Sequence, residues 1–143
     1  MPEDESTTPD LLERVRGLSE AANRGDWDAV LLSYEPRAVW DATPTLGTTF
    51  EGHAAIRRLW REWSDSYEEI RFQPEEMADL GGGIVFVRVV TDARPVGVSG
   101  NVRTSGALVY EWLDGMVARV TAYSDIDEAR AAAERLAQER ADG

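Results

Sequence analysis

The stretch NRGDWDA, residues 23–29, ends one helix and begins the next. Before it, apolar residues recur at steps of 4, 3 and 4 from Leu11 to Ala22, which is the spacing of a single helix face. Gly25 is typical of the position just after a helix, because glycine adopts a left-handed backbone without strain. Asp26 is a typical N-cap. The stretch therefore predicts two consecutive helices, the second of which runs through Tyr34.

Proline marks both limits of this helical region. Thr8-Pro9-Asp10 predicts the start of the first helix, with Thr8 as N-cap and Pro9 at the first position. Pro36 is expected to stop the second helix, whose residues Val30, Leu31 and Tyr34 are predicted to face inward. The polar, acidic residues 1–7 are predicted to form a disordered tail.

The chain then alternates between strand and helix before turning to strands alone. A short strand is expected at 38–41, a loop at 42–50, and a helix of about 13 residues after Gly52, whose apolar residues again follow a 3–4 spacing. Further strands are expected at 69–73, 77–80, 84–90, 102–113 and 116–124, with a connection at 92–100. Residues 125–141 are alanine-rich and predict a terminal helix.

Two short signals refine the strand region. Pro74 predicts an edge position or a bulge, because proline cannot donate to a strand ladder. Asp114-Gly115 predicts a tight hairpin. Helices segregated from a run of antiparallel strands indicate an α+β fold, and residues 8–141 are predicted to form one domain.

Composition limits the chemistry. The 143 residues carry a net charge of -12, with no Cys, one His and 15 basic residues that are all Arg. This excludes thiolate nucleophiles, Cys-ligated metals, lysine Schiff bases and sites that need two imidazoles. Carboxylate and phenol groups remain for acid–base chemistry, so we expect no metal and no cofactor.

Charge and hydropathy also narrow the partners. An acidic chain disfavours nucleic acid and anionic membranes, because phosphate binding depends on Lys and Arg. No apolar run is long enough for a membrane span, and no signal peptide is visible, so the expected compartment is the cytoplasm.

The opening stretch resembles the N-x-G-D-x-D-A junction of SnoaL-like proteins, a family of the nuclear transport factor 2-like superfamily. Similar motifs follow in the family's order over about residues 10–135: Ala38-Val39-Trp40 in the first strand, Phe50 to Arg57 before and into the third helix, Trp112 to Val117 at the hairpin, and Tyr123-Ser124-Asp125 with Glu128-Ala129 at the last junction. The resemblance implies a cone-shaped barrel of N-terminal helices on a curved, mostly antiparallel sheet, closed by a C-terminal helix. It also implies a homodimer formed through the outer face of the sheet.

Asp41 is the first candidate catalytic residue. In ketosteroid isomerase-like members of the superfamily a carboxylate near this region acts as general base, and such a base needs an apolar wall that tunes its pKa. Alternatively, Asp41 caps the following loop through backbone N–H groups. Tyr34 or Tyr123 would donate to the developing oxyanion.

Two charged residues are candidates for substrate binding. Asp125 either faces the cavity mouth together with Tyr123 or caps the helix that follows it, and its position favours the cap. Arg88 interrupts the apolar run IVFVRVV and needs a partner. It either binds a ligand anion or pairs with Asp41, Glu111 or Asp125.

Aromatic residues are candidates for an apolar cavity between helices and sheet. Those considered are Tyr34, Trp40, Trp60, Trp63, Tyr67 and Tyr123. Aromatic residues at helical spacing also serve as core, and we expect Trp60 or Trp63 to reach the cavity while the others pack.

The sequence therefore carries two functional hypotheses. In the first, the domain binds a small apolar or polycyclic molecule and acts as a cofactor-free isomerase, cyclase or dehydratase on a carbonyl compound. In the second, it is a ligand-binding or dimerisation module of the same fold without enzymatic activity.

Overall fold

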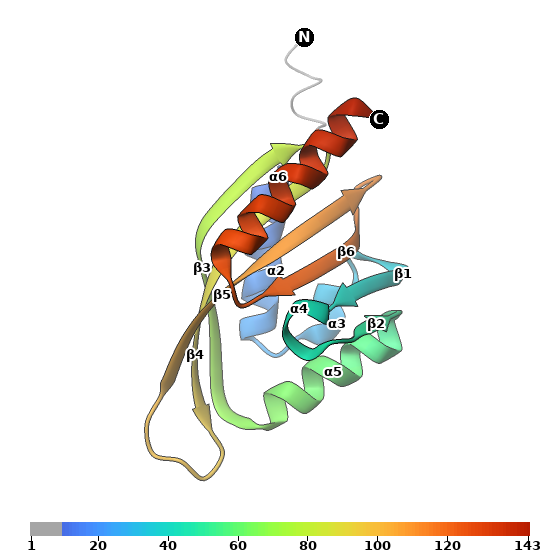
Figure 1. The fold of residues 1–143 in the computed structure, drawn as a ribbon. Coiled ribbons are helices and arrows are strands. Elements are labelled where there is room, and N and C mark those ends of the chain that lie inside the picture. Colours follow the sequence, from blue (N-terminus) through green and yellow to red (C-terminus); the bar gives the residue numbers. More distant parts are fainter. Residues whose placement is uncertain (1–9) are drawn as a thin grey trace.

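The computed structural model describes residues 10–143, so the predicted tail at 1–7 and the predicted helix start at Thr8-Pro9 lie outside the described residues. A six-stranded sheet in the order β2-β1-β6-β5-β4-β3 curls through the molecule (Figure 1). Neighbouring strands are antiparallel except β1 and β6, which run parallel. Helices cover both faces of the sheet. The predicted α+β cone with a mostly antiparallel sheet is confirmed.

The first two helices follow the capping logic of the opening stretch. Helix α2 spans Leu11–Asn23, and its N-cap is Asp10, whose Oδ1 accepts from the backbone N–H of Leu12 at 3.1 Å. Helix α3 spans Trp27–Leu31 and is capped by Asp26. Gly25 lies between them with a φ of 72°, a conformation that favours glycine. The predicted break is confirmed.

The second helix is shorter than predicted. It ends at Leu31, and strand β1 spans Tyr34–Asp41, so Tyr34 is a strand residue. Pro36 therefore lies inside a strand and does not stop a helix. The strand accepts this proline because the pairing of β1 with β6 is irregular between Tyr34 and Val39, where a missing N–H breaks no ladder bond.

The predicted loop at 42–50 contains two short elements. Helix α4 spans Thr43–Leu46, and strand β2 spans Thr49–Glu51 and pairs with the end of β1. Helix α5 spans His53–Asp65, which confirms the predicted helix of about 13 residues.

The strands of the second half are β3 (Tyr67–Gly81), β4 (Ile84–Pro95), β5 (Val102–Leu113) and β6 (Met116–Tyr123), followed by helix α6 (Ile126–Asp142). Here β3 joins the two strands predicted at 69–73 and 77–80, β4 is longer than predicted, β5 has the predicted bounds, and β6 ends one residue earlier than predicted. Strand β3 is an edge strand whose register shifts between Pro74 and Glu76, so both features predicted from this proline are present. Asp114 and Gly115 have φ values of 53° and 81°, which confirms the tight hairpin.

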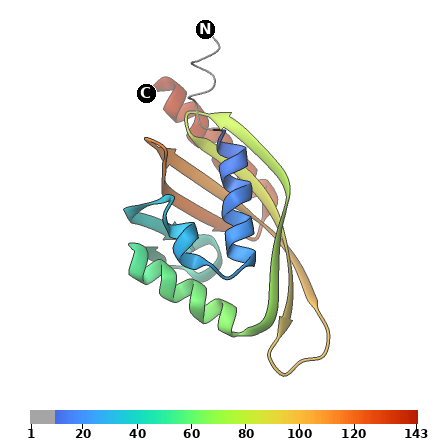
Figure 2. The same cartoon turned by 180° about the vertical axis from the view of Figure 1, so that it is seen from behind.

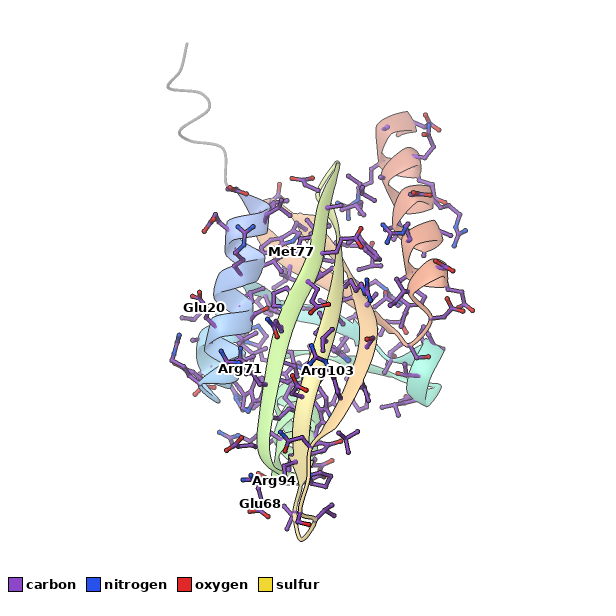
Figure 3. All side chains as sticks on the ribbon, turned by 90° about the vertical axis from the view of Figure 1, so that its left-hand side faces the viewer. Glu20, Glu68, Arg71, Met77, Arg94 and Arg103 are labelled. Carbon is purple, nitrogen blue, oxygen red and sulfur yellow. The ribbon has the colours of Figure 1, made fainter. Side chains whose placement is uncertain are left out.

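The sheet separates two apolar layers. Viewed from behind, α2 crosses one face of the strands, with α3 and α5 beside it (Figure 2). Figure 3 looks at the edge strand β3 and shows α2 and α6 on opposite sides of the sheet. The inner layer includes Val15, Ile56 and Val117, all fully buried. The outer layer packs Ala129 and Ala133 of α6 on the sheet.

Asn23 attaches α2 to the edge of the sheet. Its side-chain amide donates to the Phe72 carbonyl at 2.9 Å, and its Oδ1 accepts from the Phe72 N–H at 2.7 Å. These two hydrogen bonds fix the end of α2 against β3.

Candidate functional site

A cavity of about 390 Å³ lies between the inner face of the sheet and the helices α2, α3 and α5. This volume is in the range of small-molecule sites. The aromatic residues in its wall are Trp27, Tyr34, Trp40, Trp60, Trp63, Phe72, Tyr110 and Tyr123. Aliphatic residues such as Leu18, Val30, Val89 and Leu108 complete the apolar surface.

Trp60 is the centre of the aromatic wall. Its ring centroid lies 5.3 Å from Trp27, 5.6 Å from Tyr34 and 5.5 Å from Trp40, and the last two pairs meet edge to face. Such pairs contribute about 0.5–1.5 kcal/mol each beyond area burial. One helix residue therefore connects α3, α5 and β1 around the cavity.

Polar groups are divided between the rim and the interior of the cavity. The lining hydroxyls of Thr45, Thr104, Ser105 and Ser124 belong to exposed residues. Trp63 is 38% exposed and also lies at the rim. Among the described residues, Ser19, Thr91 and Tyr123 also carry lining hydroxyls and are half-buried, whereas Tyr34 and Tyr110 are buried, at 2% and 5% exposure.

The environment holds both interior phenols in the neutral form. Burial raises the pKa of Tyr34 well above its ordinary value, with a further increase from the nearby Tyr110. Burial also raises the pKa of Tyr110. Both hydroxyls are therefore hydrogen-bond donors throughout the physiological pH range.

None of the residues that line the cavity, all of them within 10–143, is Asp, Glu, His or Arg. In the same part of the chain, no group of three or more His, Cys, Asp or Glu side chains is placed to hold a metal ion. His53 lies at the start of α5, where its Nε2–H donates to the Tyr34 carbonyl at 3.0 Å. The imidazole thus attaches α5 to β1 and is not part of the cavity wall.

The Asp41 carboxylate lies on the face of the sheet opposite the cavity. Strand residues alternate between faces, and Trp40 takes the inner one. Asp41 accepts from the Thr43 N–H at 2.9 Å, from the Thr43 hydroxyl, and from Arg119 Nη2 at 2.6 Å. Burial alone would raise the pKa of Asp41, but these hydrogen bonds outweigh it and lower the pKa. This geometry matches the loop-capping alternative.

Arg119 and Glu111 extend this arrangement into a chain of charges on the outer face. Arg119 Nε lies 3.9 Å from Glu111, and Arg140 of α6 lies 3.8 Å from the other Glu111 oxygen. Burial raises the pKa of Glu111 despite both arginines. The two carboxylates that contact Arg119 therefore have pKa values shifted in opposite directions.

Asp125 and Arg88 are also outside the cavity wall. Asp125 caps α6 by accepting from the Glu128 N–H at 3.1 Å, which is the favoured alternative. Arg88 lies on the outer face because Val87 and Val89 take the inner one. The expectation that Arg88 pairs with Asp41, Glu111 or Asp125 is wrong for the described residues: Arg88 stands opposite Glu76 on β3, and its buried Nε has no hydrogen-bond partner.

Most of the aromatic residues that the sequence offers as cavity candidates line the cavity. Tyr34, Trp40, Trp60, Trp63 and Tyr123 line it, whereas Tyr67 does not. Trp27, Phe72 and Tyr110 line it and were not singled out in the sequence. The alternation of Leu108, Tyr110 and Trp112 along β5 was a usable signal, because period-two spacing places them on one face.

Comparison with known proteins agrees with this architecture. TerC co-crystallised with polyporic acid superposes with a TM-score of 0.69 at 18% identity, over 86% of this chain and 97% of that one. SalBIII, an epoxide hydrolase/cyclase-like enzyme in pyran ring formation in the polyether salinomycin, gives 0.67 at 19% identity, over 80% and 92%. A hypothetical protein with a ketosteroid isomerase-like fold from Catenulispora acidiphila, in complex with trimethylamine, gives 0.69 at 14% identity, over 82% and 86%. No curated protein matches the sequence.

The fold is similar to those of solved structures described as ntf2-like and ketosteroid isomerase-like. Residues 15–120 match the model of the SnoaL-like domain family, so the chain belongs to that family. None of the helices within residues 10–143 is long and apolar enough to cross a membrane.

Proposed function

We propose that the domain binds a small, largely apolar molecule in the cavity enclosed by α2, α3, α5 and the sheet. The observation that carries this proposal is a cavity of about 390 Å³ whose wall is aromatic and free of ionised side chains. Transfer of an apolar ligand from water into such a wall is favourable by about 25 cal/mol per Å² of buried apolar surface. The neighbours in complex with polyporic acid and with trimethylamine support small-molecule binding by this fold.

Isomerisation, cyclisation or dehydration of a bound carbonyl compound stays a prediction. SalBIII supports the cyclase class by similarity of fold. The geometry does not favour Asp41 as base, because its carboxylate is bound to Thr43 and Arg119 on the other face of the sheet. The cavity wall offers phenol and alcohol groups, which can polarise a carbonyl but do not accept a proton near neutral pH.

A cavity-filling substitution tests the binding proposal. Ala122 lines the cavity from β6, and Ala122→Trp should reduce the affinity for the tricyclic hydrocarbon fluorene by at least tenfold, as measured by equilibrium dialysis. Ala131→Trp places the same side chain on the exposed face of α6 and should leave the affinity unchanged. Leu108→Phe is a milder filling variant, and circular dichroism checks folding. Equal affinities in all variants would refute the proposal.

We also propose a homodimer, using the part of the outer sheet face that α6 leaves uncovered. This part carries charged side chains from β3 to β5, in which Glu69 faces Arg94 at 3.7 Å and Glu75 faces Arg103 at 3.8 Å. When a two-fold axis brings this surface together with the same surface of a second copy, acidic side chains of one copy can face basic side chains of the other. Sedimentation should show a dimer at low salt that dissociates at about 1 M salt, where charges are screened beyond about 3 Å. A monomer at low salt would refute this interface.

A further inference from the structure

Tyr34 and Tyr110 are buried side chains whose hydroxyls have no hydrogen-bond partner within residues 10–143. Burial of a hydroxyl without a partner costs about 1–3 kcal/mol. Within residues 10–143, the buried side-chain atoms that lack both a partner and accessible surface are Arg88 Nε and Trp112 Nε1. The two phenolic oxygens are not among them, so they keep accessible surface, and both residues line the cavity.

The two phenols reach the cavity from different strands. Tyr34 begins β1 and pairs with Val117 of β6, whereas Tyr110 lies on β5 and pairs with Val120 of β6. Both line the same cavity, and Tyr110 adds to the increase that burial causes in the pKa of Tyr34. Neither can ionise near neutral pH, so both present an O–H donor to the same region of the interior.

Resting on the proposed function, we infer that Tyr34 and Tyr110 together bind one oxygen atom of an uncharged carbonyl ligand whose apolar body packs among the indoles. A carbonyl oxygen has two lone pairs and accepts from two donors at once. The rings hold the phenols in place, since Tyr34 packs edge to face on Trp60 at 5.6 Å and Tyr110 stacks on Trp112 at 6.3 Å.

The same wall disfavours charged ligands. An anion would find no cationic side chain in the lining and would lose its hydration. A quaternary ammonium ion could lie against the aromatic faces, but it carries no acceptor and would leave both phenols unpartnered. The hydroxyls therefore favour a neutral ligand with an acceptor oxygen over an ammonium ion.

A matched set of probes tests this inference by equilibrium dialysis. The probes are 9-fluorenone, fluorene, fluorene-9-carboxylate and tetramethylammonium, which differ in the carbonyl oxygen and in charge. The wild-type protein should bind fluorenone roughly tenfold more tightly than fluorene, the ratio expected from two net hydrogen bonds. The carboxylate and the ammonium ion should bind more weakly than fluorenone.

Variants that lack one phenolic oxygen distinguish the contribution of the phenol pair to binding from that of the apolar cavity. Tyr34→Phe and Tyr110→Phe should each weaken fluorenone binding by roughly three- to tenfold and leave fluorene binding unchanged. The double variant should bind both probes equally. Tyr67→Phe removes the same atom from a residue outside the cavity wall and should change nothing.

The outcomes distinguish the two proposals. Fluorene binding that is lost in Ala122→Trp, combined with a carbonyl preference that survives in the double Phe variant, overturns the phenol pair and leaves cavity binding intact. A wild-type protein that binds fluorene and fluorenone equally, or tetramethylammonium most tightly, also overturns the phenol pair. Failure of every probe to bind refutes the proposed function and this inference together.

Discussion

Trp40 and Asp41 are neighbours in β1, but the indole lines the cavity whereas the carboxylate lies on the opposite face, 2.6 Å from Arg119 Nη2. Successive strand residues point to opposite faces, so the two could not have served one cavity together. Asp41 thereby stabilises the corner between β1 and α4 and contributes no charge to the ligand site.

Asp41→Asn should lower the free energy of unfolding by about 1–2 kcal/mol at pH 7 and leave probe binding unchanged. The folded-state pKa of Asp41 lies below its ordinary 3.8, so its stabilisation is present above that value and is lost as the pH falls through the folded pKa. Urea denaturation from pH 7 to pH 3 should show wild type and variant converging in acid. Asp65→Asn, at an exposed carboxylate, is the control. Loss of turnover in Asp41→Asn without loss of stability would restore the general-base hypothesis.

Glu111→Gln should have the opposite pH dependence. Burial raises the folded-state pKa of Glu111, so the folded state binds this proton more tightly than the unfolded state. The resulting stabilisation is complete below the ordinary value near 4.5 and is lost as the pH rises through the folded pKa. Denaturation curves give the free energy of unfolding of both proteins at each pH. As the pH rises from acid to 7, the difference between them should therefore change in favour of the variant. A relative loss at pH 7 would show that the pairs with Arg119 and Arg140 dominate.

Trp60→Ala should lower the free energy of unfolding by about 3–5 kcal/mol, because Trp60 is 4% exposed and packs on three other rings. Trp63→Ala should cost much less, since Trp63 is 38% exposed and lies at the rim. Chemical denaturation compares the two. Equal losses would contradict the central position of Trp60.

Ala133→Leu should destabilise the protein by about 1–3 kcal/mol by overpacking the contact between α6 and the sheet, where Ala133 has no exposed surface. Ala131→Leu makes the same change on the exposed face of α6 and should stay within about 0.5 kcal/mol of wild type. The difference between the two thermal midpoints measures how firmly α6 is docked. Similar losses of stability in the two variants would mean that the contact between α6 and the sheet can accommodate a larger side chain.

Local signals predicted the architecture well. Gly25, Asp26 and the hairpin at Asp114-Gly115 mark positions where few residues fit, so their conformations follow from residue type. Tyr34 lies in a strand although the local pattern predicts a helix, because apolar spacing over few residues fits both periods and pairing with β6 favours the strand. Such pairing joins residues far apart in the chain, which local pattern does not reveal.

The site was less predictable for a related reason. Trp40 and Trp60 were recognisable as large apolar residues on predicted elements, and both reach the cavity. Asp41, Arg88 and Asp125 carry side chains suited to catalysis or binding, but their backbone positions place them outside the cavity wall. Tyr110 lies on the inner face together with Leu108, as strand alternation predicts. The direction of each strand residue carried more information about the site than its chemical type.

The attachment of Asn23 to Phe72 has a consequence for association between molecules. Strand β3 is the edge of the sheet, and an edge with free N–H and C=O groups can recruit a strand from another chain. The Asn23 amide occupies both backbone groups of Phe72 at that edge. The residue that fixes the first helix thus also blocks the addition of a further strand at Phe72.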